Sequence, residues 1–158
     1  MVVTIGGGVM LGFEDAPVVE PVYDQAAATN ARLVNELRAR LLKSGTAVTI
    51  DMIAEATGKD PGTVRQRVTR NRAASRLITV PHDGRTLVPT AQLDKAFDLD
   101  PGAAAVVTRL VGHGMDAWSV WDWLESPNAW LGGDRPAQRL AEDDAETVHH
   151  AVSGLFQE

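Results

Sequence analysis

The chain has 158 residues, a length that suits one domain or two small ones, and its 44% of hydrophobic residues can supply a buried core. It contains no cysteine, which excludes disulfides, a thiol nucleophile and thiolate metal sites. The sequence shows neither a signal peptide nor an apolar run long enough to cross a bilayer, so we expect a soluble, cytoplasmic protein without a membrane partner.

The net charge of −6 is distributed unevenly along the chain. Residues 32–85 carry eleven Lys and Arg against five Asp and Glu. Residues 1–31 hold four acidic residues and no basic one, and residues 86–158 hold twelve acidic residues against four basic ones. A basic block inside an acidic chain predicts one module that faces a polyanion and a second module that does not.

The first 29 residues include three consecutive glycines, two prolines and four acids, with little periodicity. We therefore predict an irregular N-terminal arm over residues 1–29. Gly6 and Gly8 could begin a dinucleotide-binding loop, but Leu11 stands where that motif needs a third glycine and no βαβ pattern follows.

A helix is predicted from Asn30 to Lys43, because Leu33, Leu37 and Leu41 recur at helical spacing. This leucine stripe is long for a helix that only supports a small domain. We therefore expect a homo-oligomer, most simply a dimer.

Two short helices with a glycine turn between them follow. Thr49 is placed to cap a helix over residues 50–56, with Met52, Ile53 and Ala56 turned inward, and Gly58 ends it. A second helix begins at a proline and is predicted to bury two valines. Asp60 is placed to cap this helix, Pro61 takes its first position, and Val64 and Val68 form its buried face. This order of elements is the helix-turn-helix pattern.

A β-hairpin is predicted next, because Asp83-Gly84 separates the β-prone runs 77–80 and 85–88. A hairpin directly after a helix-turn-helix is a wing. Residues 30–95 are therefore predicted to form a winged helix-turn-helix DNA-binding domain.

The predicted DNA contacts are the long polar side chains opposite the buried valines, together with arginines after the helix and in the wing. They are Thr63, Arg65, Gln66, Thr69, Arg70, Arg72, Arg76 and Arg85. The amide of Gln66 suits adenine, Arg65 and Arg70 suit guanine or phosphate, and the remaining arginines suit phosphates. Gly62 leaves the first turn poor in base contacts, which argues against strong sequence specificity. The alternative is a solvated basic face without DNA.

Residues 96–158, after a linker at 89–99, are predicted to form a small all-α domain, so the fold class is mainly α. Trp118, Trp121 and Leu124 lie on one face of a short helix and suit core packing. Trp130 comes just before a Gly-Gly corner, where a large side chain is as easily presented as buried. Asp134 is placed to cap the helix that follows the corner.

The segment around that corner resembles the toxin-binding domain of the Xre/MbcA/ParS antitoxins. The shared residues are Trp123-Leu124, Pro127-Asn128, Leu131-Gly132-Gly133 and Arg135-Pro136, in a match that covers roughly residues 100–158. Residues 53–64 and 77–88 resemble the DNA-binding half often fused in front of this domain. The resemblance implies an antitoxin that neutralises a RES-domain, NAD-consuming toxin encoded nearby and represses its own operon by binding operator DNA.

The expected toxin contacts are the corner and the end of the last helix: Trp130, Leu131, Gly132, Gly133, Arg135, Pro136 and Phe156. Arg135 suits a carboxylate or phosphate clamp, and the alternative is a salt bridge to Asp134 or Glu125.

We expect no enzyme activity, because no nucleophile, base and orienting acid can be assembled from the sequence. The four histidines lack metal-ligand spacing, so neither a metal nor a cofactor is expected. The alternative function is a stand-alone helix-turn-helix transcription regulator whose C-terminal domain serves oligomerisation or another partner.

Overall fold

The computed structural model describes residues 19–158, which form seven α-helices and three short strands. These residues divide into two units, one ending at Ala39 and one spanning Arg40–Glu158, and each is described by itself. The first 18 residues of the predicted irregular arm lie outside the described part.

The first helix, α1, spans Val19–Lys43 and therefore begins well before the predicted start at Asn30. The prediction of an irregular chain over residues 19–29 is wrong. Pro21 lies in the first turn, where its missing N–H breaks no hydrogen bond, and residues 22–43 contain neither glycine nor proline. Leu33 and Val34 are exposed on this helix.

The next two helices, α2 (Ile50–Thr57) and α3 (Pro61–Ala73), start at the predicted caps. Thr49 accepts a hydrogen bond from Met52 N, and Asp60 accepts one from Thr63 N. The buried faces consist of Ile50, Ile53 and Ala54 on α2 and of Val64 and Val68 on α3. Met52 and Ala56 were predicted to point inward and are exposed, because the helix turns Ile50 rather than Met52 toward the core.

A three-stranded antiparallel sheet has the order β1–β3–β2, from β1 (Ala47–Thr49), β2 (Val80–His82) and β3 (Arg85–Pro89). Asp83 and Gly84 join β2 to β3 with positive φ angles of 50° and 72°, as a two-residue hairpin turn requires. The hairpin prediction is confirmed, although its first strand begins only at Val80. The sequence did not predict β1, which pairs with β3 along Thr49↔Leu87.

The core under α2 and α3 includes the segment that was predicted to be a linker. Leu93, Phe97 and Leu99 pack against the cluster built from α2, α3 and the sheet. Gln92, fully buried, accepts a hydrogen bond from Ile78 N and donates to the carbonyls of Ile78 and Pro89. These contacts fix residues 77–79 as buried, non-strand chain leading into the hairpin.

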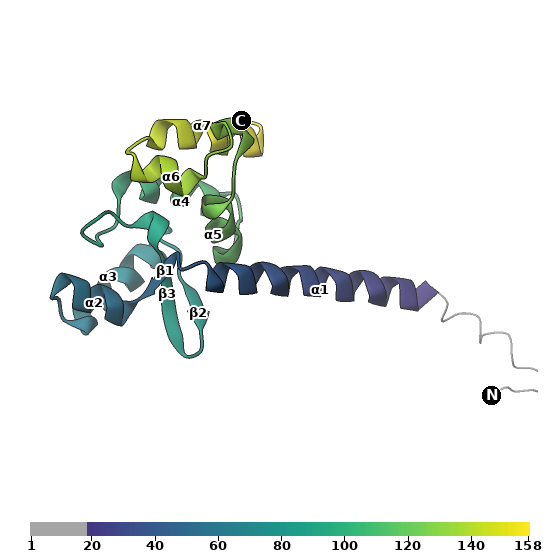
Figure 1. Ribbon diagram of the computed structural model, residues 1–158, viewed down its shortest axis with the longest axis horizontal. Coiled ribbons are helices and arrows are strands. Elements are labelled where there is room, and N and C mark those ends of the chain that lie inside the picture. The colour runs from purple at the N-terminus through teal and green to yellow at the C-terminus, as the bar shows by residue number, and fades with distance from the viewer. Residues whose placement is uncertain (1–18) are drawn as a thin grey trace, which may run out of the picture. The chain divides into compact units, whose positions relative to one another are not determined.

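Four helices follow: α4 (Pro101–Gly112), α5 (Ala117–Glu125), α6 (Pro136–Ala141) and α7 (Ala145–Phe156). In Figure 1 they form one group, and α2 and α3 lie together beside the sheet. Trp121 and Leu124 are fully buried, as predicted, and Trp121 Nε1 donates to Thr46 Oγ1 at 3.0 Å. The prediction of a mainly helical fold is confirmed. Within residues 19–158, no helix is both long and apolar enough to cross a membrane.

Candidate functional sites

The outer face of α3 carries the predicted DNA contacts. Thr63, Arg65, Gln66, Thr69 and Arg70 are all exposed, because Val64 and Val68 turn the opposite face toward the core. Arg65, Gln66, Thr69 and Arg70 line a shallow hollow of about 650 Å³ together with Gly62. Long side chains around a small residue leave room for another surface to approach the helix backbone.

The arginines among the predicted DNA contacts share a second property, which is that none of their side chains forms an ion pair within the described residues. Their side chains are exposed, and none forms an ion pair with another of the described residues. These residues are Arg65, Arg70, Arg72, Arg76 and Arg85. Five exposed guanidinium groups without an internal carboxylate give residues 65–85 an excess of unpaired positive charge.

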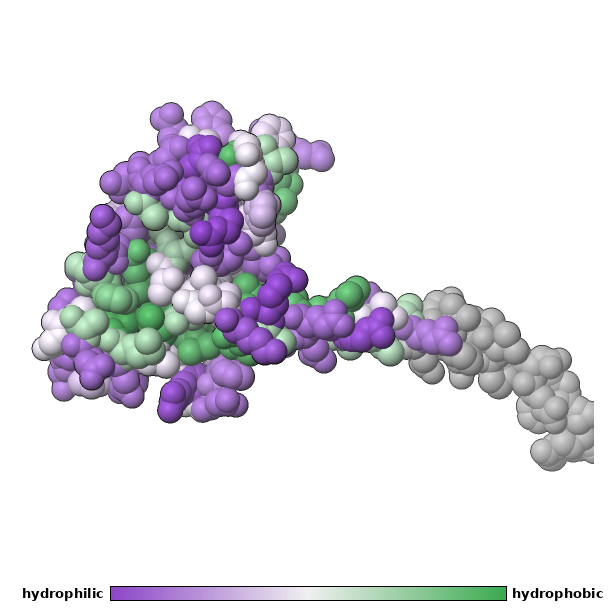
Figure 2. Space-filling view, viewed as in Figure 1, coloured by the Kyte–Doolittle hydropathy of each residue, from purple (hydrophilic) through white to green (hydrophobic). Residues whose placement is uncertain are grey.

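The hairpin tip lies close to the helices. A hollow of about 440 Å³ is lined by residues 49–52 at the start of α2, by Arg65 on α3 and by residues 84–86 of the hairpin. Figure 2 shows the tip as a hydrophilic projection. The fold thus brings Arg65 and Arg85 to one concavity although twenty residues separate them in sequence.

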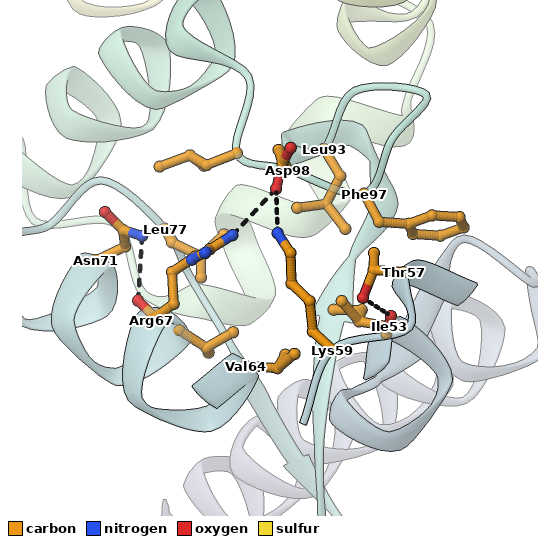
Figure 3. A pocket seen from close by; sticks show the side chains of 12 residues that line it. Ile53, Thr57, Lys59, Val64, Arg67, Asn71, Leu77, Leu93, Phe97 and Asp98 are labelled. Atoms are coloured by element: carbon orange, nitrogen blue, oxygen red, sulfur yellow. Dashed lines mark hydrogen bonds and ion pairs between the residues drawn. The ribbon is translucent and has the colours of Figure 1, made fainter. Parts of the chain in front are cut away.

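Arg67 differs from the other arginines of α3. Figure 3 shows Arg67 and Lys59 converging on Asp98, with nitrogen–oxygen distances of 3.1 and 3.4 Å. The apolar cavity beneath them has about 30 Å³ of free volume, which is room for a water molecule and not for an effector. Arg67 therefore connects the loop after Leu93 to α3 and is not one of the unpaired arginines.

The predicted partner contacts fall into exposed and buried groups. Leu131 and Pro136 are buried and support the corner from inside, whereas Gly132 and Gly133 have positive φ angles of 66° and 95° and are exposed. Asp134 does not cap α6, because its carboxylate instead accepts from Arg139, which also binds Asp144 and donates to the Leu131 carbonyl. Arg139 is the residue that holds the corner, and the sequence analysis missed it.

Trp130 has 66% of its surface exposed, yet it makes contacts within the chain. Asn128 Oδ1 accepts from Trp130 N, and the indole lies against Gly154 of α7. A methyl group on Gly154 would lie 2.7 and 2.8 Å from two indole carbons, Cζ2 and Cδ2. The absence of a side chain at Gly154 thus makes room for the indole of Trp130. Sequence reasoning could not find it, because a helical glycine carries no signal of the distant side chain that covers it.

Arg135 forms the salt bridge to Glu125 that was one of its two predicted roles, at 2.9 Å. Burial raises the pKa of Glu125, and the charge and hydrogen bond of Arg135 partly offset that rise. Because the arginine side chain remains 47% exposed, it still presents donors to solvent.

Phe156 is engaged inside the chain. Its ring stacks on His113 with centroids 3.7 Å apart. The Glu158 carboxylate accepts from Arg109 and from His113, the latter at 2.6 Å, and these hydrogen bonds lower its pKa. A partner that inserted Phe156 into a pocket would first have to break this stack.

Comparison with solved structures gives a likeness of fold. The solved structure described as "NMR structure of Rv2175c" is similar, with a TM-score of 0.53 and 19% sequence identity over 68% of this chain and 79% of that one. No family model and no curated protein matches the chain.

Proposed function

We propose that residues 30–95 act as a winged helix-turn-helix that binds double-stranded DNA, with α3 in the major groove and the β2–β3 hairpin as the wing. The observation that carries this proposal is the set of exposed arginines on α3, just after it and in the hairpin, none of which pairs with a described carboxylate. An exposed helix face that carries long polar side chains suits the major groove of B-DNA.

The test compares base recognition with phosphate contact in gel-shift titrations on the region upstream of the gene and on a scrambled duplex. Removing Gln66 should reduce preference between the two duplexes, because a bidentate base contact is worth about 1–3 kcal/mol of discrimination. Arg72→Ala should weaken both duplexes alike. Equal loss of discrimination in the two variants, or no binding by the wild type, contradicts the proposal.

We further propose that this chain is an antitoxin, whose residues 96–158 bind and silence a RES-domain toxin encoded nearby. The supporting observation is Trp130, a large aromatic side chain that is exposed and that lies against Gly154 of α7. Aromatic side chains of this kind are typical anchors of protein interfaces. Arg135 adds exposed donors beside the corner, and binding that blocks an active site requires no chemistry from this chain.

Coexpression with the adjacent gene product tests this second proposal. Trp130→Ala should abolish growth rescue and pull-down, since loss of an anchor costs about 2 kcal/mol or more. Met52→Ala is the matched control, because Met52 is also a large exposed apolar residue but lies on the DNA-facing side. If both variants rescue growth, the docking surface is wrong. If no toxin gene adjoins and nothing copurifies, the chain is instead a stand-alone regulator.

A further inference from the structure

The hollow between α2, α3 and the hairpin tip has a chemistry of its own. Its charged lining residues are Arg65, Arg85 and Asp51, and its large apolar ones are the exposed Met52 and the buried Ile50. Met52 is 51% exposed, and it lines the same hollow as the exposed residues Arg65 and Arg85. Neither arginine has an ion-pair partner in the part of the chain that the structure describes.

A nucleotide of a DNA strand matches this combination. Two guanidinium groups that reach one concavity from different elements suit a single phosphate, since each can donate two hydrogen bonds to phosphate oxygens. The exposed thioether suits the carbon atoms of a deoxyribose, because Met is flexible and polarizable. Asp51 opposes an anion, so the hollow keeps an excess of one positive charge.

On the basis of the proposed DNA binding, we infer that this hollow holds one sugar–phosphate unit of the DNA backbone, with Arg65 and Arg85 on the same phosphate and Met52 against the sugar. Arg65 is then a positioning residue and not a base contact. Base recognition falls to Gln66, Thr69 and Arg70, which line the neighbouring hollow.

Salt dependence distinguishes one shared phosphate from two separate ones. The probe is a fluorescein-labelled duplex from the region upstream of the gene, titrated with the full chain at several salt concentrations. Each phosphate neutralised contributes about 0.9 to the slope of log affinity against log salt. The Arg65→Ala/Arg85→Ala double variant should therefore lose about 0.9 in slope, whereas independent phosphates would cost about 1.8. Arg40→Ala removes an exposed arginine that pairs with Asp122 and should leave the slope unchanged.

Met52 and Asp51 provide the second readout. Met52→Ala should weaken binding roughly fivefold without changing the slope, because it removes apolar contact and no charge. Asp51→Asn should strengthen binding, since it removes the charge that opposes the phosphate. A slope loss of about 1.8 in the double variant, or unchanged binding by Met52→Ala, overturns this assignment while leaving DNA binding itself intact. A wild-type chain that binds no duplex refutes the proposed function instead.

Discussion

At the scale of single residues, the contact between Trp130 and Gly154 gives a direct test of how the corner is built. An alanine at position 154 places a methyl group where the indole lies, and the exposed indole must move away. Alanine favours the helix over glycine by about 1 kcal/mol, and the displaced indole loses its contact with residue 154. Because these two effects oppose each other, the free energy of unfolding should change by less than about 1 kcal/mol.

The measurement is an NMR spectrum of Gly154→Ala in which the nuclear Overhauser contacts between the Trp130 ring and residue 154 disappear. Gly112→Ala is the matched control, because a methyl group there meets no atom within 4 Å. An indole that keeps its wild-type contacts in Gly154→Ala would show that Gly154 is not what makes room for it.

His149 predicts a pH dependence of stability. Burial lowers its pKa below the ordinary 6.5, and the charges of Arg109 and His150 lower it further. Arg109 donates to His149 Nδ1 at 3.1 Å, which requires the neutral ring. The unfolded chain therefore takes up the proton first, and stability is lost as the pH falls below 6.5.

Urea titrations at several pH values should show this loss in the wild type and a flatter profile in His149→Gln. The lowered pKa of Glu158 acts in the same direction, but only at pH values below the ordinary 4.5 of a glutamate. A His149 proton signal that titrates above 6.5 would contradict the assignment.

At the scale of elements, Gln92 joins the hairpin to the chain on either side of it. Its side chain is fully buried and serves Ile78 N, Ile78 O and Pro89 O at 2.7, 3.0 and 3.2 Å. Gln92→Ala leaves these buried polar groups without hydrogen-bond partners and leaves a cavity. It should therefore lower the free energy of unfolding by about 2–4 kcal/mol. Gln138→Ala, at an exposed position, should change stability by no more than about 0.5 kcal/mol. Similar urea midpoints for the two variants would refute this role.

At the scale of the whole molecule, two exposed apolar residues of α1 allow a test of the predicted dimer. Leu33 and Val34 are 54% and 43% exposed, which is unusual for neighbouring apolar residues without a partner. Light scattering should give twice the 16.9 kDa of the chain. Leu33→Lys and Val34→Lys should lower the mass to that of a monomer, whereas Asn35→Lys, on the opposite side of the helix, should not. A wild-type monomer at micromolar concentration contradicts the dimer.

Most of the elements follow from local sequence signals. Thr49, Asp60 and Asp83-Gly84 correctly located two caps and a turn, because each acts on the backbone within a few residues. The strand β1 was missed because three residues that pair with Pro89, Val88 and Leu87 carry no periodicity of their own. The roles of Gln92, Arg139 and Gly154 were missed for the same reason. Each role depends on contacts with another segment of the chain, which local sequence patterns do not reveal.

Leu93, Phe97 and Leu99 pack against the core formed by α2, α3 and the sheet, and this has a consequence for synthesis of the chain. The module that begins with β1 cannot bury its own apolar surface until Leu99 has left the ribosome. A fragment cut at residue 95 would lack two of these three side chains and would expose the surface that they cover. An expression boundary for the first module therefore belongs after Leu99, beyond the boundary that composition alone suggests.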